Sequence, residues 1–304
     1  LWTLTPGQTQ PERLKIRLAT DSPEARSRFV QGSKYVRGVS VSPSGARAVV
    51  EFRGEIVTLP AEKGDPRNLT NTNNVHEREP SWSPDGKTIA YFSDEGGEYQ
   101  LVLHPAIGKG QARKIKIDGS GYYSGATWSR DSKRLLFSDN SQALYWLDVE
   151  KGKITKIVQP EHGRGRGVQI SSWSPDSKWI AFAYDTPAKI SRVWVYSTEQ
   201  NKSFPITDGL SEATEPVFDA GGKYLYFLAS SDTAMSKHGF SQSASDTRPP
   251  RWSLYVVVLR KDLPSPFARE SDEEKGPDAA RRPRFPGAPP MDEERKEEPK
   301  KDDP

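Results

Sequence analysis

One short pattern recurs about every 45 residues, and this repeat constrains the fold of the chain more than any other feature. A bulky residue is followed by Ser-Pro-Asp-Gly or a close variant, in copies that begin at Val41, Trp82, Trp128, Trp173 and Phe218. The spacings between these first residues are 41, 46, 45 and 45. A steady period of this length is typical of repeat architectures such as solenoids and propellers.

Each copy carries the signals of strands joined by tight turns. In Ser-Pro-Asp-Gly, Pro presets φ, Asp can bond to its own backbone and Gly tolerates a positive φ. Runs rich in Val, Tyr and Thr follow, and such runs predict strands. We expect second strands at 47–52, 88–92, 134–137, 179–183 and 224–228, third strands at 99–103, 143–147, 193–196 and 254–259, and fourth strands at 113–117, 153–157 and 203–207.

Four antiparallel strands per repeat indicate the blade of a β-propeller, so the predicted fold class is all-β. A single four-stranded sheet cannot bury both faces, and radial packing of the sheets buries the large residues between blades. We therefore expect the recurrent Trp residues to pack between neighbouring blades and the recurrent Asp residues to hold their turns. These residues are Trp82, Trp128 and Trp173, and Asp85, Asp131 and Asp176.

The repeat also predicts the domain boundaries. We assign 1–34 to outer strands of a preceding blade and a linker, 35–260 to five blades (about 35–74, 75–120, 121–165, 166–210 and 211–260), and 261–304 to a charged, Pro-rich disordered linker or insertion. The propeller is expected to be incomplete, because the chain starts and stops within a blade. Either Leu14–Leu18 completes the last blade or further blades lie outside this chain. The absence of a starting Met suggests an excised piece.

Several classes of function are excluded or disfavoured by composition. The chain has no Cys, which excludes disulfides, Cys-based zinc sites and a cysteine nucleophile. Its longest apolar run, Leu254–Leu259, is far shorter than the ~20 residues of a membrane helix. The net charge of +3 is spread thinly and offers no concentrated basic stripe. We therefore expect neither a membrane nor a nucleic acid as a partner.

No catalytic motif stands out. The chain has no Gly-x-Ser-x-Gly elbow, Gly-rich phosphate loop, His-Glu-x-x-His or calcium loop. The four histidines, His76, His104, His162 and His238, are scattered, and each is expected to be structural or solvated. We expect no catalytic residue, no cofactor and no metal in this chain, and whether its parent is an enzyme stays open at this point.

Two arginines are the candidate peptide contacts. Arg164 and Arg166 lie in Gly163–Gly167, just before the first strand of the fourth blade. Two guanidinium groups on flexible Gly could bind a carboxylate such as a peptide C-terminus. A plain exposed loop is the favoured interpretation, and a resemblance to RNA-binding Arg-Gly segments is weak without stacking aromatic residues.

Carboxylates cluster before two first strands. Glu77, Arg78 and Glu79 precede Pro80, and Glu212 and Glu215 take the equivalent place before Pro216. First strands line the axis of a propeller, so these residues could surround its central channel. The favoured interpretation is a solvated loop with local ion pairs.

At this point the residues resemble a known family. Residues 79–93 (EPSWSPDGKTIAYFS) and 172–182 (SWSPDSKWIAF) look like the propeller repeats of TolB and of tricorn protease, and prolyl-oligopeptidase-type enzymes carry similar blades. Residues 13–18 and 35–47 are similar to the passage from the first into the second propeller of tricorn-like proteases, and 53–56 and 67–80 to the opening blades of the second. The resemblance covers residues 1 to about 260.

The resemblance implies a non-catalytic propeller segment of a tricorn-like serine peptidase, which filters or guides peptides to a protease core outside this chain. Its implied partners are peptides or unfolded polypeptide, the rest of the parent protease and other copies of it. A TolB-like interaction module without enzymatic activity is the alternative, and the propeller of a prolyl-oligopeptidase-type enzyme is a third. We expect a cytoplasmic protein, with the periplasm as the alternative, because a Cys-free chain fits either compartment.

Overall fold

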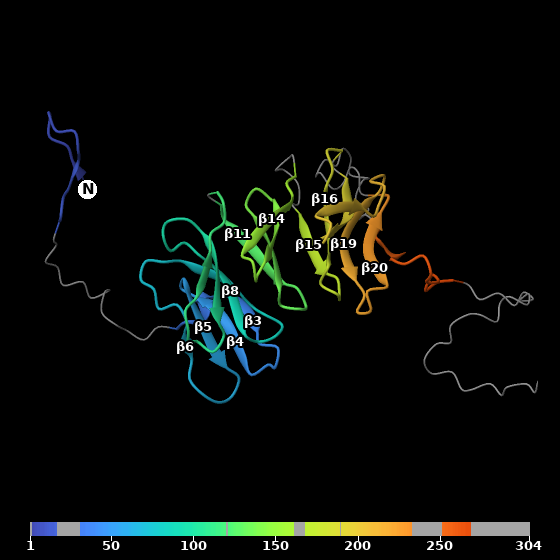
Figure 1. Cartoon of the computed structure of the whole chain (residues 1–304), viewed down its shortest axis with the longest axis horizontal. Helices are drawn as coiled ribbons and strands as arrows, with labels where there is room; N and C mark the ends of the chain where they lie inside the picture. The colour runs from blue at the N-terminus through green and yellow to red at the C-terminus, as the bar shows by residue number, and fades with distance from the viewer. Residues whose placement is uncertain are drawn as a thin grey trace, which may run out of the picture. The chain divides into compact units, whose positions relative to one another are not determined.

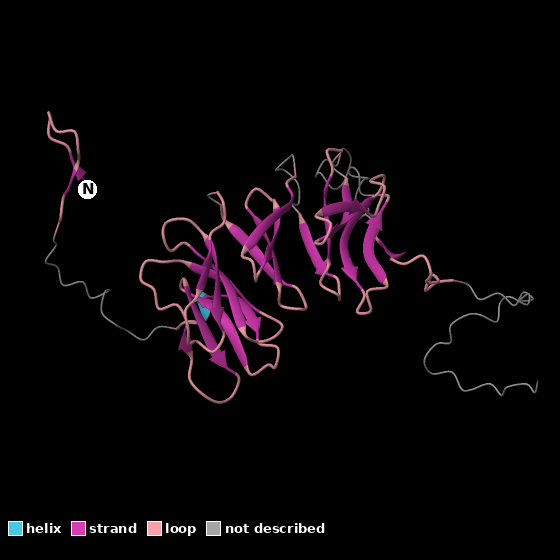
Figure 2. Ribbon diagram, in the orientation of Figure 1, coloured by secondary structure: helices cyan, strands magenta, loops and turns pink. Residues whose placement is uncertain are grey.

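The computed structural model describes residues 2–16, 31–119, 121–160, 168–188, 190–232 and 251–268. The chain divides into two compact units, Leu1–Arg260 and Lys261–Pro304, and all of the described strands belong to the first. The regular structure in the described residues is β-strand apart from one 3-10 turn at Ser33–Tyr35 (Figure 2). No helix in these ranges has the length and apolar character that crossing a membrane requires. Most of the tail lies outside the described residues.

Five antiparallel sheets follow one another along the chain, and in each the strands pair in chain order (Figure 1). The first four sheets are β3 (Val36–Val41), β4 (Arg47–Phe52), β5 (Glu55–Pro60) and β6 (Arg67–Asn68); β7 (Glu77–Trp82), β8 (Thr88–Ser93), β9 (Gln100–Pro105) and β10 (Arg113–Ile115); β11 (Tyr123–Trp128), β12 (Arg134–Asp139), β13 (Leu144–Asp148) and β14 (Lys153–Val158); and β15 (Gln169–Trp173), β16 (Trp179–Asp185), β17 (Ser191–Ser197) and β18 (Lys202–Pro205). The described part of the fifth has three strands, β19 (Glu212–Phe218), β20 (Tyr224–Ser230) and β21 (Ser253–Val258).

These sheets confirm the predicted all-β blades. Every predicted second, third and fourth strand overlaps an observed one, and β4 has the predicted bounds. The third and fourth strands of the first sheet, β5 and β6, were not assigned from the sequence. Strand β6 has only two residues, too few for a period-two pattern to be recognised.

A separate hairpin precedes the first sheet. Strand β1 (Trp2–Thr3) pairs antiparallel with β2 (Glu12–Arg13), within the ranges predicted as outer strands of another blade. Leu14 and Ile16 are exposed, and β21 pairs only with β20 among the described strands. Residues 17 and 18 lie outside the described residues, so completion of the fifth sheet by Leu14–Leu18 stays a prediction.

The cores lie between successive sheets, as the propeller prediction requires. Each of four buried clusters combines side chains of two neighbouring sheets. Phe92 of β8, for example, lies with its ring centroid 5.9 Å from that of Phe137 of β12. The faces of each sheet are buried against its neighbouring sheets. The stability of the fold therefore depends mainly on the packing at these boundaries.

The recurrent Trp residues pack at these boundaries, which confirms that prediction. Trp128 and Trp173 are buried, and each indole N–H donates a hydrogen bond to a carbonyl of the preceding sheet. The distances are 3.1 Å from Trp128 Nε1 to the Ser81 oxygen and 3.2 Å from Trp173 Nε1 to the Thr127 oxygen. An indole that is both buried and bonded in this way fixes the distance between two sheets.

The recurrent Asp residues hold their turns, also as predicted. Asp85 Oδ1 accepts hydrogen bonds from Ser83 Oγ at 2.6 Å and from the backbone nitrogen of Lys87 at 3.0 Å. Asp131 and Asp176 make the equivalent contacts in the third and fourth sheets. The Asp therefore has a local structural role in each repeat.

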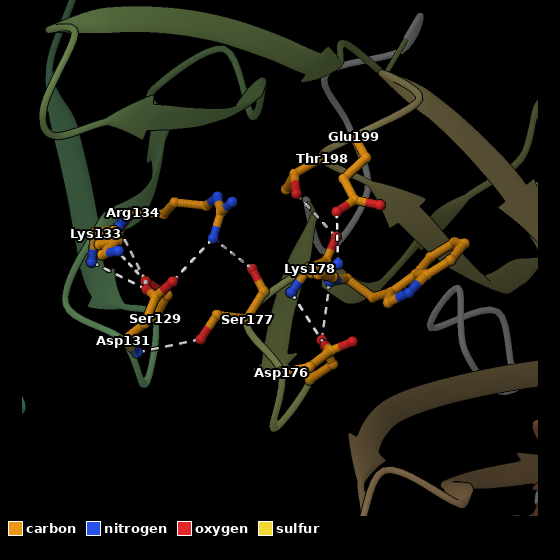
Figure 3. Close-up of polar contacts among 11 residues, drawn as sticks. Ser129, Asp131, Lys133, Arg134, Asp176, Ser177, Lys178, Thr198 and Glu199 are labelled. Carbon is orange, nitrogen blue, oxygen red and sulfur yellow. Dashed lines mark hydrogen bonds and ion pairs between the residues drawn. The ribbon is translucent and has the colours of Figure 1, made fainter.

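Two serines connect the turns of neighbouring sheets. Ser132 and Ser177 have φ of 59° and 60°, at the repeat position where other copies have Gly. Ser177 Oγ accepts a hydrogen bond from the Asp131 nitrogen at 3.1 Å, and its carbonyl accepts one from Arg134 Nη1 at 3.0 Å (Figure 3). Ser132 Oγ accepts the equivalent bond from the Asp85 nitrogen. The serines thus bind the third sheet to both of its neighbours.

We expect Ser177→Ala to lower the free energy of unfolding by about 1 kcal/mol, because the Asp131 N–H loses its acceptor while the left-handed backbone keeps its strain. Ser177→Gly should lower the free energy of unfolding by less than Ser177→Ala does, because Gly adopts the left-handed conformation without strain. Urea unfolding followed by circular dichroism measures both. An Ala variant as stable as the parent chain would show that the bond contributes nothing.

Candidate functional site

In the first strands of several sheets the pairing register shifts, and a residue with positive φ lies at each shift. The pairing register shifts within β3, β7, β11 and β19, and at the shift lie Gly38 (φ 44°), Glu79 (φ 52°), Gly125 (φ 74°) and Glu215 (φ 53°). These are β-bulges, which re-aim side chains near functional sites. A left-handed conformation costs a residue other than Gly about 1–2 kcal/mol, so the two glutamates need compensating contacts.

Glu79 makes contacts that join three sheets. Its Oε2 accepts a hydrogen bond from the Gly125 nitrogen of the third sheet at 2.7 Å, and its Oε1 accepts one from Arg78 Nη2 at 2.5 Å. Its own backbone nitrogen donates to Glu51 Oε2 of the first sheet at 3.1 Å. Charge-assisted bonds of this kind are strong enough to offset the strain at Glu79.

Arg78 is fixed beside it. The side chain is almost fully buried, and Nη1 donates to the Tyr123 carbonyl of the third sheet at 2.9 Å. Its guanidinium carbon lies 3.5 Å from the ring centroid of Tyr122, a close cation–π contact. The positive charge of Arg78 is therefore compensated by Glu79 and by the ring.

A cleft of about 510 Å³ opens over these groups between the first and second sheets. We call it the inner-strand cleft, and it is lined by Lys34, Tyr35, Arg37, Gly38, Glu51, Arg53, Gly54, His76, Arg78, Glu79 and Tyr122. Four of these side chains are cationic and two are anionic. Its lining is therefore polar and carries an excess of positive charge.

His76 forms part of the wall. Its Nδ1 lies 2.8 Å from the hydroxyl of Tyr99, and its Nε2 lies 3.9 Å from Glu51 Oε1. Burial raises the pKa of the Tyr99 hydroxyl.

Glu77 is buried at the start of β7. Its side chain is 1% exposed, Oε1 accepts a hydrogen bond from Thr72 Oγ1 at 2.6 Å, and Oε2 has no partner in the described part of the chain. Desolvation by burial raises the pKa of this carboxyl, and the bond from Thr72 offsets part of that rise.

We expect Glu77→Gln to stabilise the chain at neutral pH, and by less in acid. A carboxyl whose pKa is raised on folding stabilises the fold below its unfolded pKa, and that contribution is lost as the pH rises through the folded pKa. Gln can still accept the bond from Thr72 and carries no charge. Urea unfolding at pH 4, 6 and 8 measures the difference, and a gain that does not grow with pH would contradict the assignment.

The structure corrects one prediction about the carboxylate clusters. Glu77 and Arg78 belong to β7 and Glu212 to β19, and all three are buried, so the solvated-loop interpretation was wrong for them. The reason is that both first strands begin several residues before the turn motif. Glu212 Oε2 accepts a hydrogen bond from the Ser191 nitrogen of the preceding sheet at 3.0 Å.

The predicted peptide contacts Arg164 and Arg166 lie outside the described residues, as do His162 and His238. His104 is buried, with Nδ1 2.9 Å from the Pro105 oxygen, a structural role as expected. Sequence reasoning missed Lys34, Arg37, Arg53 and Tyr122. One signal was available, because Arg37 occupies the same repeat position in β3 as Arg78 does in β7.

A second cavity, of about 530 Å³, lies between the fourth and fifth sheets. Its walls are mainly apolar and include Trp179, Phe204, Phe218 and Leu259. Among the described residues, no group of three or more His, Asp or Glu is arranged to hold a metal ion. The inner-strand cleft therefore offers the richer binding chemistry.

The chain was compared with known proteins. Residues 36–299 match the family model of the tricorn protease second beta propeller domain. Tricorn protease homolog 1 of Streptomyces coelicolor is 25% identical over 275 residues, which cover 88% of this chain and 25% of that protein. The tricorn protease homolog of Saccharolobus solfataricus is 24% identical over 280 residues, 90% of this chain and 24% of that protein.

Among solved structures, the crystal structure of tricorn protease matches with a TM-score of 0.62 and 18% sequence identity, over 90% of this chain and 27% of that one. This likeness supports the propeller fold. The chain spans about a quarter of the length of the curated relatives it matches.

Proposed function

Because the chain belongs to the tricorn protease second β-propeller domain family, we propose that it is a non-catalytic propeller segment that filters or guides peptides towards a protease core outside this chain. The parent is then a serine-type peptidase that acts on peptides or unfolded polypeptide. Other copies of the parent are a further expected partner.

The observation that carries this proposal is the inner-strand cleft. Its lining joins cationic, anionic and aromatic side chains, which can hold the charged ends and the main chain of a peptide. In a propeller the first strands surround a central channel, and Gly38 and Glu79 belong to first strands. The hydrogen bonds of Arg78 and Glu79 hold the cleft wall in one conformation, which suits a surface that guides peptides without cleaving them.

The test uses the isolated chain and a labelled ten-residue peptide of mixed sequence. We expect saturable binding of the free peptide by fluorescence anisotropy. The same ten residues held within a folded protein should not bind. Absence of binding at millimolar concentrations would overturn the proposal.

We expect the double substitution Arg164→Ala and Arg166→Ala to weaken peptide handling without unfolding the chain. Loss of two cationic contacts is worth about 1 kcal/mol, roughly a fivefold fall in kcat/KM of the intact protease for a ten-residue peptide. The matched control is Lys63→Ala with Lys109→Ala, two exposed cations in loops that precede fourth strands. Equal kinetics of the two double variants would remove Arg164 and Arg166 from the site.

A further inference from the structure

We infer that the inner-strand cleft recognises the C-terminal carboxylate of a peptide through Lys34, Arg37 and Arg53. The inference rests on the proposed function, because it presumes that the chain handles peptides. It adds the chemical group by which a peptide is held and the side chains that hold it.

No carboxylate or carbonyl group of the described residues binds the side chains of these three cations. Each lines the cleft and is exposed, and none of the three side chains has a hydrogen bond or an ion pair within the described ranges. Lys34 Nζ and Arg53 Cζ lie 5.0 Å and 5.2 Å from the ring centroid of Tyr35, so both cations contact the same ring at the edge of the cleft. Cations gathered in this way attract an anion.

The two acids of the cleft do not cancel its positive charge. Glu79 is paired with Arg78. Glu51 is buried and accepts a bond from the Glu79 nitrogen, and no ion pair joins it to Lys34, Arg37 or Arg53 in the described part of the chain. Three cations therefore face one remaining acid, and the net positive charge is available to a ligand.

The position of Arg53 indicates a role beyond turn formation. Arg53 and Gly54 form the two-residue turn between β4 and β5, with φ of 55° and 86°. Asn is favoured at the first position of such a turn, and Arg is strained there. A Cβ on Gly54 would lie 3.2 Å from His76 Cδ2 and 3.3 Å from the Val75 oxygen, so the turn packs tightly against the neighbouring loop. A fixed turn presents the Arg53 side chain at the cleft.

A peptide C-terminus suits this cleft. Arginine pairs with a carboxylate through two parallel hydrogen bonds. The aromatic rings of Tyr35 and Tyr122 can contact the last side chain of the peptide.

The test compares one labelled peptide as its free acid and as its C-terminal amide, bound to the full chain and followed by fluorescence anisotropy. We expect the free acid to bind about tenfold more tightly than the amide. The double variant Arg53→Asn with Arg37→Gln should bind both forms with the affinity that the parent chain has for the amide. Asn suits the turn at 53, so this variant is expected to fold, which circular dichroism checks. The Lys63→Ala and Lys109→Ala control should keep the preference.

Each remaining outcome overturns the inference in a distinguishable way. If the parent chain binds acid and amide equally, the inference fails and the proposed function stands. If inorganic phosphate displaces the free acid at a lower concentration than acetate does, the cleft is a phosphate site and the inference fails. If neither form binds, the proposed function fails with it.

Discussion

Replacing Trp128 with Ala is expected to lower the free energy of unfolding by about 3–5 kcal/mol. The side chain is 8% exposed and belongs to the cluster shared by the second and third sheets, where it packs with Tyr123, Leu135 and Phe137. The substitution removes a large apolar surface and leaves a cavity that the neighbouring strands fill only in part. It also removes the indole N–H that donates to the Ser81 carbonyl.

Urea unfolding followed by far-ultraviolet circular dichroism measures this effect without relying on indole fluorescence. The matched control is Trp252→Ala, because Trp252 is 36% exposed. We expect its loss in free energy of unfolding to be well under half of that for Trp128→Ala. A Trp128→Ala variant with an unchanged unfolding midpoint would show that the boundary between the second and third sheets does not depend on this residue.

The strands could be predicted because the information for them is local. A turn such as Ser83–Gly86 carries its own geometry, with Pro for φ, Asp for the hydrogen bonds and Gly for the positive φ of 75°. The same turn, followed by an apolar strand, recurs in the next blade. The period then implies sheets packed on one another, and the position of Trp128 confirms this step from local pattern to packing.

The candidate site could not be predicted in the same way. Arg78 is a charged residue in a polar stretch, and the sequence indicates a solvated loop there. Its burial follows from contacts 45 residues away, with the carbonyl of Tyr123 in the next sheet. The inner-strand cleft likewise depends on side chains from a turn, a 3-10 segment, three strands and the segments that precede β7 and β11. Its geometry arises only when the first and second sheets pack.

Replacing Arg78 with Met is the second substitution for which we expect a large effect, a fall of about 2–3 kcal/mol in the free energy of unfolding. Met keeps much of the apolar stem and removes the guanidinium. The Tyr123 carbonyl and Glu79 Oε1 then lose their donor, and Tyr122 loses its cation–π contact. Because the Glu79 side chain is 32% exposed, water partly solvates the carboxylate that remains, so we expect less than the full cost of an isolated buried charge.

Lys114→Met is the matched control in the same sheet. The ion pair of Lys114 with Glu95 has an N–O distance of 2.7 Å, but the two side chains are 44% and 43% exposed, so its loss should cost below about 1 kcal/mol. Arg78→Lys separates charge from geometry, because Lys keeps the charge but cannot form the same pair of bonds. If Arg78→Met is no more destabilising than Lys114→Met, the buried network of Glu51, Arg78 and Glu79 does not hold the first three sheets together. A large loss in Arg78→Met, with an intermediate one in Arg78→Lys, would show that the wall of the inner-strand cleft is itself an essential contact between sheets.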